Sequence, residues 1–102
     1  MPIMEISIVP IGTKKTSISK YIAFCEEAIR NTKGIKAQLT AMGTIIEAPS
    51  LKKLFGIAEK MHKEAFRHGV KRLVTDIKID DRHDKKASIE SKVEAVKRRM
   101  HI

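Results

Sequence analysis

The sequence predicts an α+β fold built on one antiparallel sheet, and three observations support this prediction. Four segments alternate apolar and polar residues with the period of two that half-buried strands have. Three other segments repeat apolar residues every three or four positions, as amphipathic helices do. The order is strand, helix, strand, strand, helix, strand and a further helix. With 102 residues, the chain has room for one domain, residues 1–102, around one core.

The first strand is predicted over residues 3–11, where apolar and polar side chains alternate from Met4 to Ile8. A polar, basic connector follows, and Ser17 or Ser19 is expected to cap the first helix by accepting a backbone N–H bond. The apolar stripe of this helix consists of Ile18, Ile22, Cys25 and Ile29. Gly34 is expected to end the helix, because glycine readily takes a positive φ.

Residues 35–48 predict a β-hairpin with Met42 and Gly43 as a two-residue turn. The predicted pairs are Ala41 with Thr44, Leu39 with Ile46, and Gln38 with Glu47. In this register Leu39, Ile46 and Ala48 lie on the buried face, and the opposite face carries Gln38, Thr40, Ile45 and Glu47. The lone carboxylate of Glu47 is therefore expected outside the core, although its neighbours in the sequence are apolar.

Pro49 and Ser50 open the second predicted helix, with Ser50 able to cap it, and Gly69 closes it. Its predicted apolar stripe is Leu51, Leu54, Phe55, Ala58, Met61, His62, Ala65 and Phe66. The last strand is predicted from Val70, with Leu73, Thr75, Ile77 and Ile79 on one face. After a polar connector, Ser88 is expected to cap a third helix with a narrow apolar stripe of Ile89, Val93, Val96 and Met100.

This order of elements is that of a ferredoxin-like βαββαβ sandwich with an additional C-terminal helix and a four-stranded antiparallel sheet. Two helices cover one face of such a sheet and leave the other open. The open face is predicted to carry Glu5, Ser7, Val9, Ile11, Gln38, Thr40, Ile45, Glu47, Arg72, Val74 and Asp76. Because aliphatic and polar groups are mixed there, we expect another subunit to cover this face and a ligand to bind in between.

The net charge of +9 raises the question of nucleic acid binding. The basic residues fall mostly on the predicted outer faces of helices, which favours ordinary solvated surfaces. An RNA-binding module of this fold stacks bases on aromatic side chains of its strands, whereas all aromatic residues here fall in predicted helices. Nucleic acid is therefore not the expected partner, and weak, salt-sensitive binding stays as an alternative.

No segment has the apolar length of a membrane span, and the first residues lack the pattern of a signal peptide. We therefore expect a cytoplasmic protein that does not associate with membranes. Cys25 is the single cysteine, which excludes an internal disulfide and a cysteine-rich metal site.

We expect no catalytic residues and no metal site. The string DDRHD, residues 80–84, resembles a magnesium-binding pattern, but it follows a strand and basic residues surround it. His62 is expected to be a packing residue, and Cys25 belongs to a buried stripe. An acylphosphatase-like enzyme would need an arginine after the first strand to hold phosphate, and the loop there, GTKKTS, has two lysines instead.

Three segments together resemble a known family: QLTAMGTIIEA (38–48), KMHKEAFRHGVKRLVT (60–75) and IKIDDRHDK (77–85). The chain is similar over essentially its whole length to the small thiamine-binding proteins, formerly a domain of unknown function. The resemblance implies a ferredoxin-like dimer or tetramer that binds thiamine or a related pyrimidine, with no catalytic activity established for the family. The chain departs from the family pattern at Ala41, where proline is usual, and at His83, where arginine is usual.

Strand alternation suggests which residues line such a site. Thiamine has a cationic thiazolium ring and an aminopyrimidine with donors and acceptors, so carboxylates, hydroxyls, amides and apolar contacts suit it. The candidate ligand-binding residues are Glu5, Ser7, Gln38, Thr40, Met42, Thr44, Ile45 and Glu47. Thiamine would be a ligand and not a cofactor. Two alternatives stay open: Glu47 forms a structural ion pair with Arg72, Lys36 or a second subunit, and the protein is a structural or regulatory homo-oligomer without a ligand.

Overall fold

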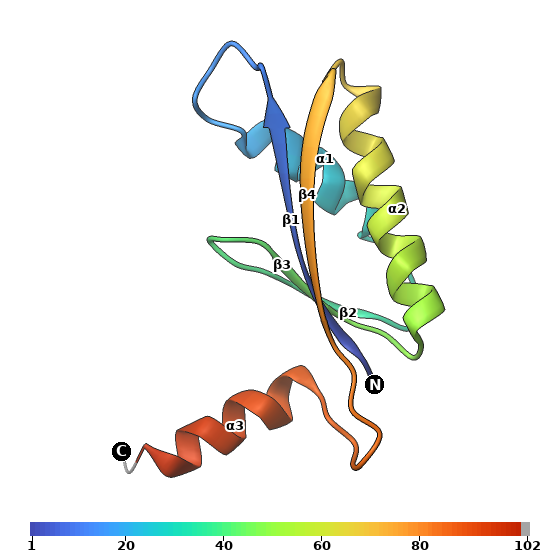
Figure 1. Ribbon diagram of the computed structural model, residues 1–102, viewed down its shortest axis with the longest axis vertical. Coiled ribbons are helices and arrows are strands. Elements are labelled where there is room, and N and C mark those ends of the chain that lie inside the picture. Colours follow the sequence, from blue (N-terminus) through green and yellow to red (C-terminus); the bar gives the residue numbers. More distant parts are fainter. Residues whose placement is uncertain (101–102) are drawn as a thin grey trace.

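The structure, a computed structural model, describes residues 1–100 and confirms the predicted ferredoxin-like α+β fold. The elements are β1 (Ile3–Ile11), α1 (Ser19–Ile29), β2 (Lys36–Leu39), β3 (Thr44–Glu47), α2 (Leu51–Arg67), β4 (Arg72–Asp80) and α3 (Ile89–Arg99). The sheet order is β2-β3-β1-β4, and all neighbouring strands are antiparallel (Figure 1).

The central strand β1 organises the sheet. It pairs with β4 along its whole length, from Ile3 opposite Asp80 to Ile11 opposite Arg72. Its alternate side chains Met4, Ile6 and Ile8 are buried against the helices, as their period of two predicts. The odd-numbered side chains of β1, from Ile3 to Ile11, therefore point to the other face of the sheet.

Helices α1 and α2 pack on one face of the sheet and enclose the core. From α1, Cys25 and Ile29 are buried, and the Cys25 thiol donates to the Met61 carbonyl at 3.4 Å. The buried residues of α2 are Leu54, Ile57, Ala58, Met61 and Ala65. The predicted stripe omitted Ile57, and it was wrong for Phe55 and Phe66, which are exposed.

The ends of α1 differ from the prediction. The residue before the helix is Ile18, which provides no side-chain cap, and Ser17 instead accepts a long 3.5 Å bond from the Ser19 N–H. The helix ends at Ile29, well before Gly34. Gly34 has a φ of +81° in the turn that leads to β2, so it shapes that turn and does not end the helix. The predicted serine caps of α2 and α3 are confirmed at Ser50 and Ser88.

The predicted hairpin register is wrong by two residues. Leu39 lies opposite Thr44, and Ala37 lies opposite Ile46, so a four-residue connection joins β2 and β3. A shift of two residues returns each side chain to the same face, because side chains alternate with a period of two. The predicted faces of Gln38 and Ile45 therefore hold, although the predicted pairs do not.

Helix α3 projects from the end of the domain where β4 finishes (Figure 1). Ser88 and Ser91 form a reciprocal capping box at its start. None of its residues is buried, and Val93, Val96 and Met100 are 50, 60 and 53% exposed. The helix therefore presents an uncovered apolar stripe. Across residues 1–100, no helix combines the length and the apolar character that crossing a bilayer requires.

Candidate functional site

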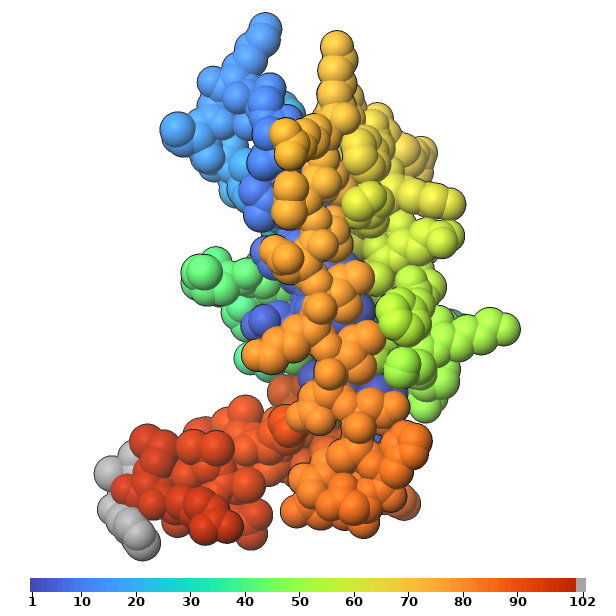
Figure 2. Space-filling view, in the orientation of Figure 1, coloured from blue at the N-terminus to red at the C-terminus, as the bar shows by residue number. Residues whose placement is uncertain are grey.

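The sheet face opposite α1 and α2, called the open face below, collects side chains from all four strands. The register places there Ile3, Glu5, Ser7, Val9 and Ile11 of β1, Lys36 and Gln38 of β2, Ile45 and Glu47 of β3, and Arg72, Val74, Asp76, Lys78 and Asp80 of β4. The face mixes aliphatic groups with both signs of charge, as the alternation predicted. In Figure 2 the β4 segment (orange) runs along the middle of the molecule, with part of β1 (blue) beside it.

A row of four side chains crosses the open face at its centre. Gln38 lies opposite Ile45, Ile45 opposite Glu5, and Glu5 opposite Lys78. Ser7 lies two residues further along β1. Within residues 1–100 the side chains of Glu5, Ser7 and Gln38 form no hydrogen bonds, so a carboxylate, a hydroxyl and an amide are available to a bound molecule.

Glu47 lies at the end of this face and is only 5% exposed. Its Oε1 atom accepts a hydrogen bond of 2.8 Å from the backbone N–H of Ile89, the first residue of α3. A carboxylate is stabilising at the N-terminus of a helix, because unpaired N–H groups give that end a partial positive charge. Glu47 therefore fastens α3 to the sheet. Within residues 1–100 its Oε2 atom accepts no hydrogen bond.

Two ion pairs flank the contact between Glu47 and α3. Lys36 of β2 pairs with Glu90, and Lys92 pairs with Asp80 of β4. The hydrogen bond from Lys36 lowers the pKa of Glu90, and the one from Lys92 lowers the pKa of Asp80. All three contacts involve the first four residues of α3. The beginning of α3 is therefore held by charge against one end of the open face.

The turn between β2 and β3 is built by Thr40. Its hydroxyl donates to the Gly43 carbonyl at 2.8 Å and accepts from the backbone N–H groups of Met42 and Gly43. Met42 is 82% exposed at the tip. A Cβ atom on Gly43 would lie 2.9 Å from the backbone oxygen of Ile6, so this position admits only glycine without movement of the backbone.

Thr44 lies on the other side of the sheet. It is 3% exposed, and its hydroxyl donates to the Glu26 carboxylate of α1. Of the eight candidate residues, the structure brings five together on the open face: Glu5, Ser7, Gln38, Ile45 and Glu47. Thr40 and Met42 belong to the adjoining turn, and Thr44 is separated from the rest by the sheet.

Sequence reasoning missed the residues that hold α3 at the open face. Ser88 carries a clear capping signal, but no local pattern indicates that the N–H of Ile89 bonds to a residue 42 positions earlier. The sequence likewise does not indicate which residues form ion pairs with Lys36, Glu90 and Lys92. Within residues 1–100, no group of three or more His, Cys, Asp or Glu side chains could hold a metal ion.

The arrangement on the open face is suited to binding a small, flat, cationic molecule. Glu5 supplies negative charge, Gln38 and Ser7 supply hydrogen bonds in both directions, and Ile45 supplies an aliphatic surface between them. No helix covers this face on a single chain, so a molecule bound there would stay partly exposed. A second layer of protein over the open face would complete the enclosure.

Comparisons with known proteins agree on one family. A sequence model of the family described as "Thiamine-binding protein" matches residues 4–97. The chain is 40% identical over 103 residues to UPF0045 protein YqgV of Bacillus subtilis, with 98% of each chain covered. The crystal structure of protein MJ1052 from Methanocaldococcus jannaschii superposes with a TM-score of 0.85 at 33% identity, covering 94% of this chain and 95% of that one. A domain of unknown function from Bacillus cereus shares the fold, with a TM-score of 0.78 at 24% identity over 90% of this chain and 86% of that one.

Proposed function

Because the chain belongs to the thiamine-binding protein family, we propose that it binds thiamine or a related pyrimidine or heterocyclic cation on the open face, without transforming it. The observation that carries the proposal is the row from Gln38 through Ile45 to Glu5, in which unpaired polar groups flank an aliphatic side chain. The Glu5 carboxylate would meet the thiazolium cation, and Gln38 and Ser7 would bond to the aminopyrimidine.

Glu47 can contribute in two ways. Its Oε1 atom bonds to Ile89, while its Oε2 atom has no partner within residues 1–100 and lies on the same face as Glu5. A ligand cation near Oε2 would share the carboxylate with α3. Ligand binding and the attachment of α3 would then be linked, because both depend on the same side chain.

A second copy of the chain would cover the open face and enclose the ligand. The face carries Val9, Val74 and Ile11 beyond the polar row, and α3 carries the uncovered stripe of Val93, Val96 and Met100. Aliphatic surfaces of this kind are stabilised when they are buried between subunits. We therefore place the ligand at or beside a homodimer or homotetramer interface in this proposal.

The experiment is a calorimetric titration of the protein with thiamine, in parallel with Glu5→Gln, Glu47→Gln and the control Glu94→Gln on the exposed side of α3. Each variant removes one negative charge. Losing a charge-assisted hydrogen bond costs about 1.5–3 kcal/mol, so we expect Glu5→Gln to bind roughly 10 to 100 times more weakly. The control should bind as the wild type does.

Oligomeric mass, measured by light scattering, separates the proposal from its alternative. Weak binding by Glu5→Gln with an unchanged mass supports a ligand contact. If thiamine releases no heat with any form, and Glu47→Gln breaks into smaller species, the open face serves only to join subunits and the binding proposal fails. The bond between Glu47 and Ile89 inside the chain favours a structural role for this carboxylate over a ligand contact.

The strands provide no stacking platform for nucleic acid bases. Tyr21 and Phe24 lie in α1, Phe55 and Phe66 lie in α2, and none of the four strands contains an aromatic residue. This arrangement favours a small-molecule ligand for the open face.

A further inference from the structure

A pocket of about 790 Å³ lies at the end of the sheet remote from α3. Its walls are the loop of residues 12–18 after β1, the start of α1, and the segment of residues 69–71 before β4. Figure 2 shows the loop after β1 (blue) and the start of β4 standing apart at this end of the molecule. The volume falls within the range of small-molecule sites, about 300–1,000 Å³.

The charged side chains that line this pocket are all positive. They are Lys14, Lys15, Lys20 and Lys71, and no acidic residue is among the lining residues. None of the four forms an ion pair with another residue in the range 1–100, whereas other lysines of the chain, such as Lys36, Lys63 and Lys92, do. Unneutralised positive charges gathered around a concave surface attract a polyanion.

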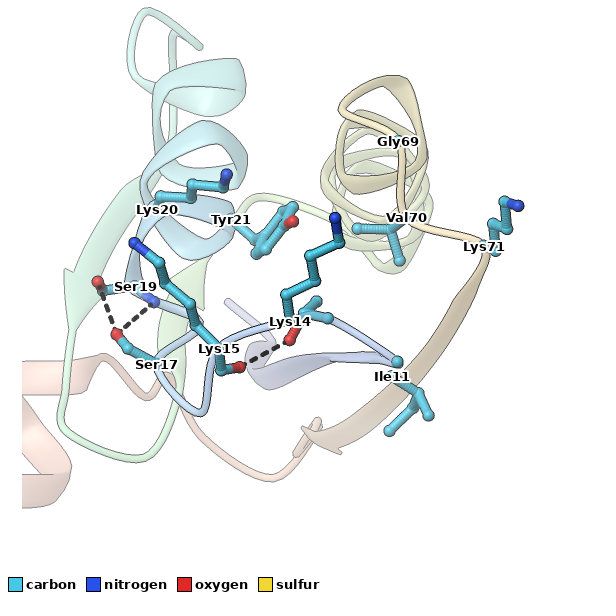
Figure 3. A pocket seen from close by; sticks show the side chains of 12 residues that line it. Ile11, Lys14, Lys15, Ser17, Ser19, Lys20, Tyr21, Gly69, Val70 and Lys71 are labelled. Carbon is cyan, nitrogen blue, oxygen red and sulfur yellow. Dashed lines mark hydrogen bonds between the residues drawn. The ribbon is translucent and has the colours of Figure 1, made fainter.

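The four lysines differ in direction. Figure 3 shows Lys14 extending between Tyr21 of α1 and Val70, while Lys71 extends away. The start of α1 adjoins them, with no side-chain cap at Ile18 and no acidic residue in its first turn. Its partial positive charge therefore adds to that of the lysines.

The lining also provides an apolar wall. The ring of Tyr21 and the side chain of Val70 flank Lys14, and the Lys20 ammonium lies 5.1 Å from the centre of the Tyr21 ring. Inorganic phosphate would leave this wall unused. A phosphate ester with an organic group would place its phosphates against the lysines and its organic group against Tyr21.

We propose that this pocket is a second binding site, for a small organic diphosphate or triphosphate. The site is independent of the open-face proposal. Glu5 and Ser7 of the open-face site lie six and four residues before Ile11 on β1, where the pocket begins, so they are about 20 and 13 Å away at 3.3 Å per residue. The loop has lysines where an acylphosphatase-like enzyme would need arginine, so the site binds its anion without transferring a phosphoryl group.

The test uses ADP, pyrophosphate and adenosine as probes in calorimetric titrations of the full chain. The double variant Lys14→Gln/Lys15→Gln removes two charges from the pocket, and Lys52→Gln/Lys53→Gln removes two from the exposed surface of α2. We expect ADP to bind once per chain and to bind at least about tenfold more weakly to the pocket variant. The surface variant should stay within about twofold of the wild type. Circular dichroism and the melting temperature establish that both variants fold.

Three results would overturn the proposal: no binding of ADP or pyrophosphate at millimolar concentration, equal losses in both double variants, or binding of adenosine as tight as that of ADP. Equal losses would indicate attraction by net charge alone.

Sedimentation with vesicles containing phosphatidylserine distinguishes a lipid headgroup from a free phosphate ester. Binding to vesicles without binding of ADP would contradict the small-molecule assignment. Thiamine binding by Lys14→Gln/Lys15→Gln should be unchanged, so failure at one site is distinguishable from failure at the other.

Discussion

Substitution of Gly43 by alanine should destabilise the protein, although it adds only one methyl group. The new Cβ would lie 2.9 Å from the Ile6 carbonyl oxygen, 3.5 Å from the Ile6 carbonyl carbon and 3.7 Å from Cγ of Glu5. The first distance is shorter than Cβ contacts that proteins tolerate, and the obstructing atom belongs to the backbone of the central strand. The β2–β3 hairpin must therefore move away from β1.

The cost can be estimated from known overpacking effects. Inserting a methyl group into a packed region destabilises the folded state by about 1–3 kcal/mol. Replacing glycine by alanine stabilises it by about 0.4–1 kcal/mol, because alanine lowers the conformational entropy of the unfolded chain. Taken from the middle of the two ranges, the net loss of unfolding free energy is about 1–2 kcal/mol. For a domain of this size, 1 kcal/mol shifts the melting temperature by about 4–8 °C. We therefore expect Gly43→Ala to melt roughly 5–15 °C lower.

Gly56→Ala is the matched control, because it makes the same chemical change in α2. A Cβ at Gly56 meets no atom within 4 Å, and the residue is exposed in the middle of a helix. Alanine is favoured over glycine there by about 0.8–1 kcal/mol, so this variant should melt at a higher temperature. Differential scanning calorimetry at one protein concentration measures both shifts. A melting temperature of Gly43→Ala equal to or above the wild type would refute the reasoning, since the close approach of the two strands would then carry no penalty.

Two further predictions concern single side chains. Burial raises the pKa of the Cys25 thiol to about 11. At pH 8 a disulfide reagent such as DTNB should therefore modify Cys25 at least roughly a hundredfold more slowly in the native protein than in urea. Equal rates would contradict the burial of this thiol. The hydrogen bond from Arg82 lowers the pKa of Asp84 to about 2. The ion pair should therefore be intact above the ordinary carboxyl pKa of about 3.9, and it should be lost as the pH falls through 2. Arg82→Gln should return the Asp84 pKa to near 3.9 in an NMR titration, and a wild-type value already near 3.9 would refute the pairing.

The sheet could be predicted from the sequence because its strands obey local patterns. The bounds of β1 agree with the prediction, and the faces of β1 and β4 follow directly from alternation. Ser50 and Ser88 were identified as caps because the capping hydrogen bond joins residues three positions apart. Interactions between residues this close together in the chain can be predicted from the sequence itself.

The hairpin register could not be predicted from the same patterns. Alternation has a period of two, so registers that differ by two residues bury the same side chains and look equally good. The choice is made by Thr40, whose backbone N–H and hydroxyl both bond to the Gly43 carbonyl and close a four-residue turn. A serine or threonine at the start of such a turn is a known signal, but in this sequence the Met42–Gly43 pair offers a competing two-residue turn.

The role of Glu47 was predicted only in part. Alternation placed it on the open face, which the structure confirms. Its bond to Ile89 depends on where a helix 42 residues later comes to lie, and that position follows from the path of the connector after β4. Whether Glu47 also contacts thiamine stays a prediction.

The attachment of α3 makes its direction sensitive to ionic strength. The exposed pairs of Lys36 with Glu90 and of Lys92 with Asp80 are screened as salt is added, since the Debye length falls from about 10 Å at 0.1 M to about 3 Å at 1 M. The bond between Glu47 and Ile89 is largely shielded from solvent and should persist. Raising the salt concentration would thus leave the helix tethered at one point and free to swing, so small-angle scattering should record a broader distribution of shapes in concentrated salt than in dilute buffer.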